Sequence, residues 1–298
     1  EPRCRVGVPV DISEAHLAFY AVLRDDVRAQ ASKLRRGQSA IELIKARRSV
    51  MRLLQAAVNP ELVANEFVGT VDASKSGLLD AVLAEGISNR VRAAADLADE
   101  MASAGRKVLV WTIFTSTLHQ LTRLLAHHQP AVIYGAVGVG DEADDETRQG
   151  QIRRFKQDPD CRVMVANPAA ASEGMSLHMQ CHDAIYVDRS YNATHFMQSV
   201  DRIHRLGLPA GTETTIFVLQ NRLPKGIGSI DMSVARRLAT KIRAMEQLLQ
   251  DPDLHELALD EEDMDPSLDE SIDMQDIDDL VAELESRAPP ADEEAGIV

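Results

Sequence analysis

Two arginines near residue 200 carry the strongest chemical signal in this sequence. Arg202 and Arg205 lie three positions apart, so a helix would place both guanidinium groups on one face. Arginine stays protonated, and its planar group can hold a phosphate through two parallel hydrogen bonds. The spacing therefore predicts that the two side chains reach one anionic target together.

The stretch that contains them, residues 198–207, reads Q-x-x-x-R-x-x-R-x-G. It resembles motif VI of superfamily-two helicases, in which the arginines reach across a cleft to the γ-phosphate of ATP bound by the partner lobe. The resemblance implies that Arg202 and Arg205 act as arginine fingers. It also implies that Gln198 and Asp201 orient the helix that carries them.

Three further segments resemble motifs of the Swi/Snf family of DNA-dependent ATPases, in the family's order. Residues 107–116 resemble motif IV, residues 172–177 resemble the G-E-G-x-N-L of motif V, and residues 188–192 resemble D-P-W-W-N. Ser172 and Ser176 replace a glycine and an asparagine of motif V, and the tryptophan pair is absent. The chain is similar to the C-terminal RecA-like lobe of this family, and closest to its diverged bacterial members.

The same resemblance implies roles for the remaining site residues. Glu173 and Gly174 would couple the nucleotide state to the grip on DNA, because a glycine lets the backbone approach phosphate closely. Hydroxyl groups at a helix N-terminus after residue 114 would hold a phosphate of the DNA backbone. The implied DNA contacts are Lys107, Thr115, Ser116 and Asn192.

A nucleotide-cradling half is missing from the sequence, which has no G-x-x-x-x-G-K-[ST] pattern. Residues 141–144 spell D-E-A-D, the letters of a helicase Walker B box. They follow a glycine-rich stretch and precede more acidic residues, which predicts a solvent-exposed loop. ATP with Mg²⁺ is therefore expected to bind mainly to an N-terminal RecA-like lobe of the same parent protein. This chain alone is expected neither to hydrolyse ATP nor to translocate.

Three function classes compete. The resemblance implies ATP hydrolysis coupled to movement along double-stranded DNA. The alternative is a stand-alone, non-catalytic module that binds DNA or protein, which the basic stretch 28–48 and the acidic tail favour and the arginine pair opposes. An RNA-directed helicase is disfavoured by the long helix expected after residue 229.

Histidine and cysteine positions give no metal or disulfide prediction. His178, Cys181 and His182 are metal-ligand types, but a fourth ligand at a sensible spacing is not evident. The 3 cysteines are odd in number and widely spaced, which excludes a disulfide framework and indicates a reducing cytoplasm. No apolar run approaches membrane length and no signal peptide opens the sequence, so no membrane partner is expected.

Alternating helices and short apolar strands must position these residues. Strands this short and apolar predict an α/β fold, with a RecA-like parallel sheet that carries helices on both faces. The strands are expected at 108–114, 131–134, 162–166, 184–188 and 214–219. The helices are expected at 89–104, 117–128, 146–157 and 193–206.

The predicted organisation has four parts. They are a helical segment with a connector at 1–88, the second RecA-like helicase lobe at 89–228, a brace helix at 229–250 and an acidic, largely flexible tail at 251–298. Within the tail, Ser267 and Glu270 form a capping-box signature for a short amphipathic helix.

Charge is distributed very unevenly along the 298 residues, whose formal net charge is −15. The tail from residue 251 holds 19 of the 47 acidic residues and 1 of the 32 basic residues, which leaves residues 1–250 with 31 basic and 28 acidic residues. A slightly basic body is compatible with DNA binding. The tail is either a solubilising extension or a segment that docks on a protein partner or on the basic body itself.

Overall fold

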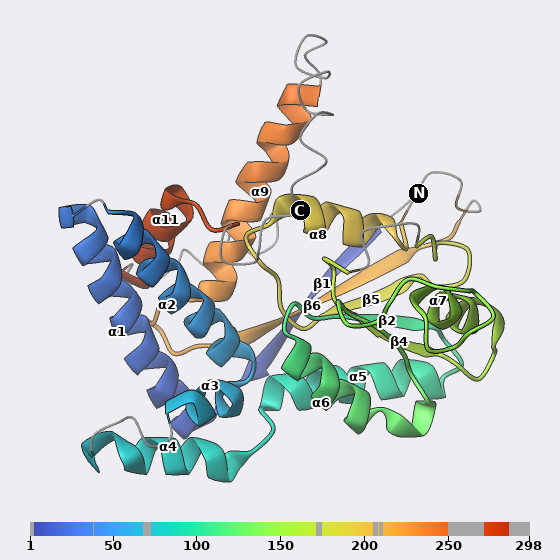
Figure 1. The fold of residues 1–298 in the computed structure, drawn as a ribbon, viewed down its shortest axis with the longest axis horizontal. Helices are drawn as coiled ribbons and strands as arrows, with labels where there is room; N and C mark the ends of the chain where they lie inside the picture. Colours follow the sequence, from blue (N-terminus) through green and yellow to red (C-terminus); the bar gives the residue numbers. More distant parts are fainter. Residues whose placement is uncertain are drawn as a thin grey trace.

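One parallel sheet organises the computed structural model, which describes residues 3–37, 39–67, 73–170, 175–204, 208, 211–249 and 271–285. Its strands run in the order β1-β6-β5-β2-β4-β3 (Figure 1). They are β1 (Arg3–Asp11), β2 (Val108–Trp111), β3 (Ala131–Ile133), β4 (Val163–Ala166), β5 (Asp183–Tyr186) and β6 (Thr214–Arg222). All the pairings are parallel, and the predicted RecA-like α/β fold is confirmed.

Helices cover both faces of this sheet. Val108 and Val110 of β2 belong to the core that includes α5 (Asn89–Ser103) and α6 (Thr115–Leu124). Leu109 and Trp111, on the opposite face, belong to the core that includes α7 (Arg148–Gln157) and α8 (Ala193–Asp201). Because both faces are buried, β2 and β4 are apolar at every position, which is why their sequence signal is clear.

The edge strand β1 was not predicted, since residues 1–88 were expected to hold helices and a connector. It pairs with β6 along its whole length, from Arg3 opposite Thr214 to Asp11 opposite Arg222. Its sequence, RCRVGVPVD, carries two arginines, a glycine and a proline, which weaken a strand signal. A proline is tolerated here because β1 lies at the edge of the sheet.

A helical group stands beside the sheet (Figure 1). It comprises α1 (Glu14–Gly37), α2 (Ala40–Val58), α3 (Pro60–Phe67) and α4 (Ala73–Glu85). Within the helical segment expected at 1–88, α1 and α2 are separate helices, and Ser39 caps α2 by accepting a hydrogen bond from the Glu42 backbone N–H at 3.3 Å. In the described part of the chain, no helix is both long and apolar enough to cross a bilayer.

The brace helix predicted after residue 229 is present as α9 (Ile230–Leu249), and its first turn is anchored in the core. Arg90, at the start of α5, donates to both carboxylate oxygens of Asp231 at 2.9 Å. Further donor atoms of Arg90 reach the carbonyl oxygens of Val187 and Leu219, each at 2.7 Å. One buried ion pair therefore ties α5, α9, β6 and the end of β5 together.

Part of the acidic tail is folded onto the helical group as α11 (Met274–Glu285). The predicted cap residues Ser267 and Glu270 lie outside the described residues. The helix begins instead with a reciprocal cap, in which Asp276 N–H donates to Asp273 Oδ1 at 2.7 Å and Asp273 N–H donates to Asp276 Oδ2 at 2.9 Å.

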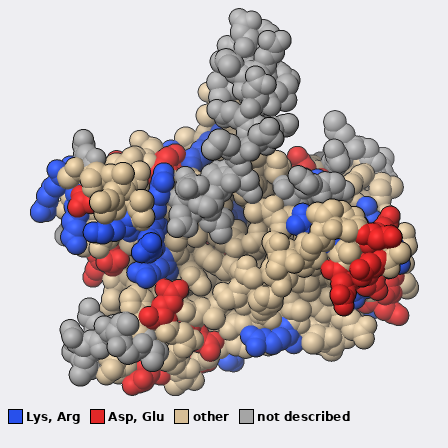
Figure 2. Space-filling view, in the orientation of Figure 1, with Lys and Arg blue, Asp and Glu red and all other residues tan. Residues whose placement is uncertain are grey.

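The acidic side chains of α11 meet basic residues of α1 and α9. Asp276 is fully buried and lies 2.7 Å from both Arg237 Nε and Lys241 Nζ. Arg35 of α1 pairs with Asp278 at 2.8 Å. Figure 2 shows Lys and Arg side chains gathered over α1 and α2, so this described part of the tail lies against the basic region of the chain.

Candidate functional site

The turn that follows β2 is held by two neighbouring strands. Asp188, after β5, accepts hydrogen bonds from Thr112 Oγ1 at 2.6 Å and from the Ile113 backbone N–H at 2.7 Å. Asn167, after β4, donates from Nδ2 to the Ile113 carbonyl oxygen at 2.9 Å. Both backbone groups of Ile113 are therefore fixed by side chains from adjacent strand ends, which orients the helix that begins immediately afterwards.

That helix, α6, starts with Thr115 and Ser116, two of the predicted phosphate contacts. Thr115 is exposed, and the N-cap residue Phe114 gives no side-chain cap. Four other helices, α2, α5, α7 and α8, begin with side-chain caps from Ser39, Ser88, Thr147 and Asn192. The first-turn N–H groups of α6, together with the two hydroxyls, suit an anion because a helix N-terminus carries partial positive charge.

Asp188 is a residue that the sequence indicated only as part of a motif. Burial raises the pKa of this carboxyl to about 6, although the hydrogen bonds from Thr112 and Ile113 act in the opposite direction. Its position between β2 and β5 follows from their register, in which Trp111 lies opposite Tyr186. Asp188 is thus a positioning residue for the start of α6.

The helix predicted at 193–206 is shorter in the structure, because α8 ends at Asp201 and Arg202 lies directly after it rather than on its face. Arg202 is bound to the segment that resembles motif V. Its Nη1 donates to the Met175 carbonyl oxygen at 3.1 Å, and its own carbonyl oxygen accepts from the Leu177 backbone N–H at 2.8 Å. The predicted partners Arg205, Glu173 and Gly174 lie outside the described residues, so their roles stay predictions.

The two residues predicted to orient the arginine helix lie on α8. Gln198 is half-buried, and its Oε1 is buried without a hydrogen-bond partner among the described residues. Asp201 is exposed at the last position of the helix. Asn192 begins the same helix as its cap and accepts from the His195 backbone N–H at 3.0 Å. Its amide oxygen therefore has a structural task, and its predicted contact with DNA stays a prediction.

Lys107 has a structural role in this lobe. Its ammonium donates to the carbonyl oxygens of Phe155, Asp158 and Cys161, the last two at 2.8 and 2.9 Å. An ammonium has three protons, so these contacts occupy its donor capacity. Its predicted contact with DNA stays untested. Tyr191, the aromatic kept from D-P-W-W-N, is buried and its hydroxyl lies 3.0 Å from Ser233 Oγ.

The acidic box at 141–146 is a solvent-exposed loop, as predicted. All six residues are exposed, and Asp141 and Asp144 accept from the backbone N–H groups two positions further on, each at 2.9 Å.

The metal-ligand types noted in the sequence do not converge in the described residues. Cys181 is buried, which raises the pKa of its thiol to about 12. Its sulfur lies near backbone carbonyls, while His178 Nδ1 lies 2.8 Å from Ser176 Oγ.

Comparisons with known proteins find similar sequences and similar folds. Residues 90–207 match the helicase conserved C-terminal domain. The ATP-dependent helicase fft2 of Schizosaccharomyces pombe is 26% identical over 172 residues, which cover 55% of this chain and 13% of that protein. This chain therefore spans only a small part of that relative's length.

Solved structures share the fold at low identity. The C-terminal part of the Fun30 ATPase domain is 17% identical with a TM-score of 0.56, covering 80% of this chain and 89% of that one. The Sulfolobus solfataricus SWI2/SNF2 ATPase core, solved in complex with double-stranded DNA, is 15% identical with a TM-score of 0.55, covering 85% of this chain and 47% of that one. At these identities the likeness concerns the fold.

Proposed function

Because this chain carries a helicase C-terminal domain with the fold of the Swi/Snf C-terminal lobe, we propose that it is the second motor lobe of an ATP-dependent translocase on double-stranded DNA. In this function the lobe contributes positive charge to a nucleotide held mainly elsewhere, and it contributes backbone contacts to DNA. A second, N-terminal RecA-like lobe is its partner.

On the nucleotide side, the donor chemistry of Arg202 fits a phosphate, because a guanidinium offers five N–H donors in a planar fork. One of its nitrogens, Nη1, is used on the Met175 carbonyl oxygen. ATP with Mg²⁺ would supply the phosphoryl group whose transfer drives movement. Arg202 and Arg205 would stabilise negative charge on it, while Gln198 and Asp201 hold the helix in place. Such fingers contribute about 10³–10⁵ in rate.

On the DNA side, the first turn of α6 would hold a backbone phosphate. Thr115 and Ser116 offer hydroxyl donors there, and the turn before them is fixed by Asp188 and Asn167. A rigid turn costs less conformational entropy on binding than a mobile one. Asn192 and Lys107 are weaker candidates, because both already make structural contacts.

The observation that carries the proposal is the double link between Arg202 and the segment 175–177. A displacement of the arginine backbone must move the Leu177 N–H, because the two share a hydrogen bond. Glu173 and Gly174 precede this segment directly, so a change at the nucleotide would pass to them by a short covalent path. This link is the physical basis for coupling the nucleotide state to the grip on DNA.

The test measures ATP hydrolysis stimulated by duplex DNA in the full-length polypeptide that contains this sequence, and in this chain alone. Arg202→Ala is expected to lower the stimulated rate by about 100-fold or more with DNA binding retained. The matched control is Arg222→Ala, which removes an exposed arginine paired with Asp11. Undiminished hydrolysis in the Arg202 variant, or turnover by this chain alone, would contradict the proposal.

A stand-alone binding module is the second candidate, and the contact between α11 and the basic helices favours it. An acidic segment already occupies part of that basic region, through Arg35, Arg237 and Lys241. If the full-length polypeptide binds DNA but hydrolyses no ATP, this second function replaces the first.

A further inference from the structure

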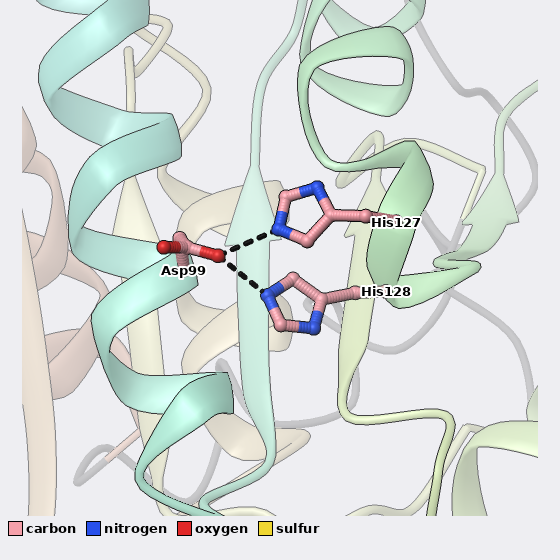
Figure 3. Close-up of side chains that lie close together, drawn as sticks. All are labelled: Asp99, His127 and His128. Carbon is pink, nitrogen blue, oxygen red and sulfur yellow. Dashed lines mark hydrogen bonds and ion pairs between the residues drawn. The ribbon is translucent and has the colours of Figure 1, made fainter.

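Three side chains that the proposed function does not use converge on one point. Asp99 of α5 faces His127 and His128 of the short 3₁₀ turn η1 (Ala126–His128) (Figure 3). The Nε2 atoms of both histidines lie 2.7 Å from the same oxygen, Asp99 Oδ1. In the part of the chain that the structure describes, this is the group of His, Cys, Asp and Glu whose donor atoms come within 4.8 Å of one another.

The backbone after the histidines is built to hold this arrangement. Consecutive side chains on a helical turn normally diverge, yet the two rings lie 4.2 Å apart between centroids. Gln129 follows at φ 47°, in the left-handed region that residues other than glycine seldom adopt. Arg154 of α7 donates to the Gln129 and Pro130 carbonyl oxygens at 2.8 and 2.9 Å and so fixes the turn.

We propose that Asp99, His127 and His128 form a binding site for a divalent transition-metal ion of the Zn²⁺ class. Imidazole nitrogen and carboxylate oxygen are the donor types that Zn²⁺, Ni²⁺ and Cu²⁺ prefer. Two imidazoles and one carboxylate supply three ligands, and water completes the coordination. Because the side chains of His127 and Asp99 are 58% and 47% exposed, an ion can enter from solvent.

The geometry needs only a small adjustment to accept an ion. Donor atoms at about 2.0–2.1 Å from a tetrahedral Zn²⁺ lie about 3.3 Å apart. The present nitrogen–oxygen separations of 2.7 Å must therefore lengthen by about 0.6 Å, which small rotations of the exposed His127 and Asp99 side chains can supply. Binding also requires the tautomer in which each neutral imidazole carries its proton on Nδ1 and leaves the Nε2 lone pair for the ion. Protons compete with the ion for the same nitrogens, so metal affinity falls at low pH.

The metal would act at a distance from the motor contacts. Asp99 lies near the end of α5, whereas Arg90 at its start is the residue tied to the end of β5. Nine residues of α-helix separate them, which is about 14 Å along the axis. A bound ion would therefore link α5 to the turn before β3 and stabilise the lobe, without touching the proposed phosphate contacts. The proposal stands independently of the proposed function.

The test uses the untagged protein, titrated with Zn²⁺ by calorimetry and with Co²⁺ by its visible ligand-field absorption. We expect one equivalent to bind, and a rise in the thermal unfolding midpoint at saturation. Asp99→Asn, His127→Gln and His128→Gln are each expected to weaken binding at least about 10-fold. The matched controls, Asp96→Asn on the same helix and His119→Gln, are expected to leave it unchanged.

Each other outcome would overturn the proposal. No binding at millimolar ion means that the three side chains form a hydrogen-bonded cluster only. Binding that the three variants do not weaken places the ion elsewhere in the protein. Thermal unfolding of each variant without metal shows whether the variant is folded. His127→Gln changes the most exposed of the three ligands, so this variant is expected to fold and keeps the proposal testable.

Discussion

Arg90 and Asp231 form an ion pair across the lobe, with the guanidinium only 2% exposed. Arg90 comes from the start of α5 and Asp231 from the start of α9, 141 positions later in the chain. A buried pair of this kind contributes little beyond well-packed apolar residues, but removing one partner leaves a buried charge. The pair therefore specifies where the brace helix begins.

Asp231→Ala is expected to lower the free energy of unfolding by about 3–5 kcal/mol, because Arg90 would remain buried without its carboxylate. Asp11→Ala removes an exposed partner of Arg222 and is expected to cost at most about 1 kcal/mol. Urea unfolding followed by far-ultraviolet circular dichroism measures both. Equal losses in the two variants would show that burial of the first pair has no energetic consequence.

The Asp188 carboxyl is expected to lower the free energy of unfolding as pH rises, which is the opposite of the usual effect of a carboxyl group. Its pKa is about 6 in the folded state against 3.8 for the ordinary carboxyl, so the folded state holds a proton that the unfolded chain releases. Stability from this group therefore decreases as pH rises from about 4 to 6, by roughly 3 kcal/mol in total.

His16 acts in the opposite direction over the same interval. Burial lowers its pKa from 6.5 to about 4, so its contribution is present above pH 6.5 and is lost as pH falls towards 4. Asp188→Asn removes the carboxyl titration and keeps one oxygen that can accept from the Ile113 N–H, so the variant should show a steeper loss of stability in acid. Urea titrations at several values between pH 4 and 7 test this, and parallel curves for the two proteins would contradict the assignment.

A negative charge at the start of α6 is expected to weaken DNA binding without lowering the stability of the protein. Thr115→Asp is expected to leave stability unchanged or raise it by about 0.3–1 kcal/mol, because the helix has no side-chain cap and its N-terminus favours an anion. The same charge repels a phosphate, so affinity for duplex DNA should fall severalfold at fixed salt. Thr194→Asp, in the first turn of the capped helix α8, is the control. Equal DNA affinity in both variants argues against α6 as a phosphate contact.

Removal of residues 251–298 is expected to strengthen binding to duplex DNA and to steepen its salt dependence. The deletion frees Arg35, Arg237 and Lys241 from the carboxylates of α11, and more cations then release counterions from DNA. It also exposes apolar surface under α11, so the unfolding midpoint should fall. The double variant Asp276→Asn with Asp278→Asn removes the carboxylates that pair with these three cations and keeps the apolar contacts. Unchanged DNA affinity in both proteins would leave α11 with a structural role only.

The sequence predicted the central sheet well because periodicity and apolarity are local signals. Strands β2 to β6 and helices α5 to α7 were expected within a few residues of their ends, whereas the helix expected at 193–206 ends at Asp201. The clamp on Ile113 was not expected, since Asp188 and Asn167 reach it from strands distant in sequence, and nothing local indicates such a contact. The contacts of the Lys107 ammonium with the carbonyl oxygens of Asp158 and Cys161 were also not expected, because those residues lie 51 and 54 positions further along the chain.

The pairing of β1 with β6 has a practical consequence for anyone who divides this chain. The family match ends at residue 207, before β6 begins, and β1 lies outside it at the other end. A fragment of residues 90–207 would expose β5, which is apolar at three of its four positions, as a bare sheet edge that could pair with a second molecule. The sheet is therefore complete only when β1 and β6, which lie far apart in the sequence, are both present. Residues 90–207 expressed alone are expected to aggregate through the exposed edge of the sheet.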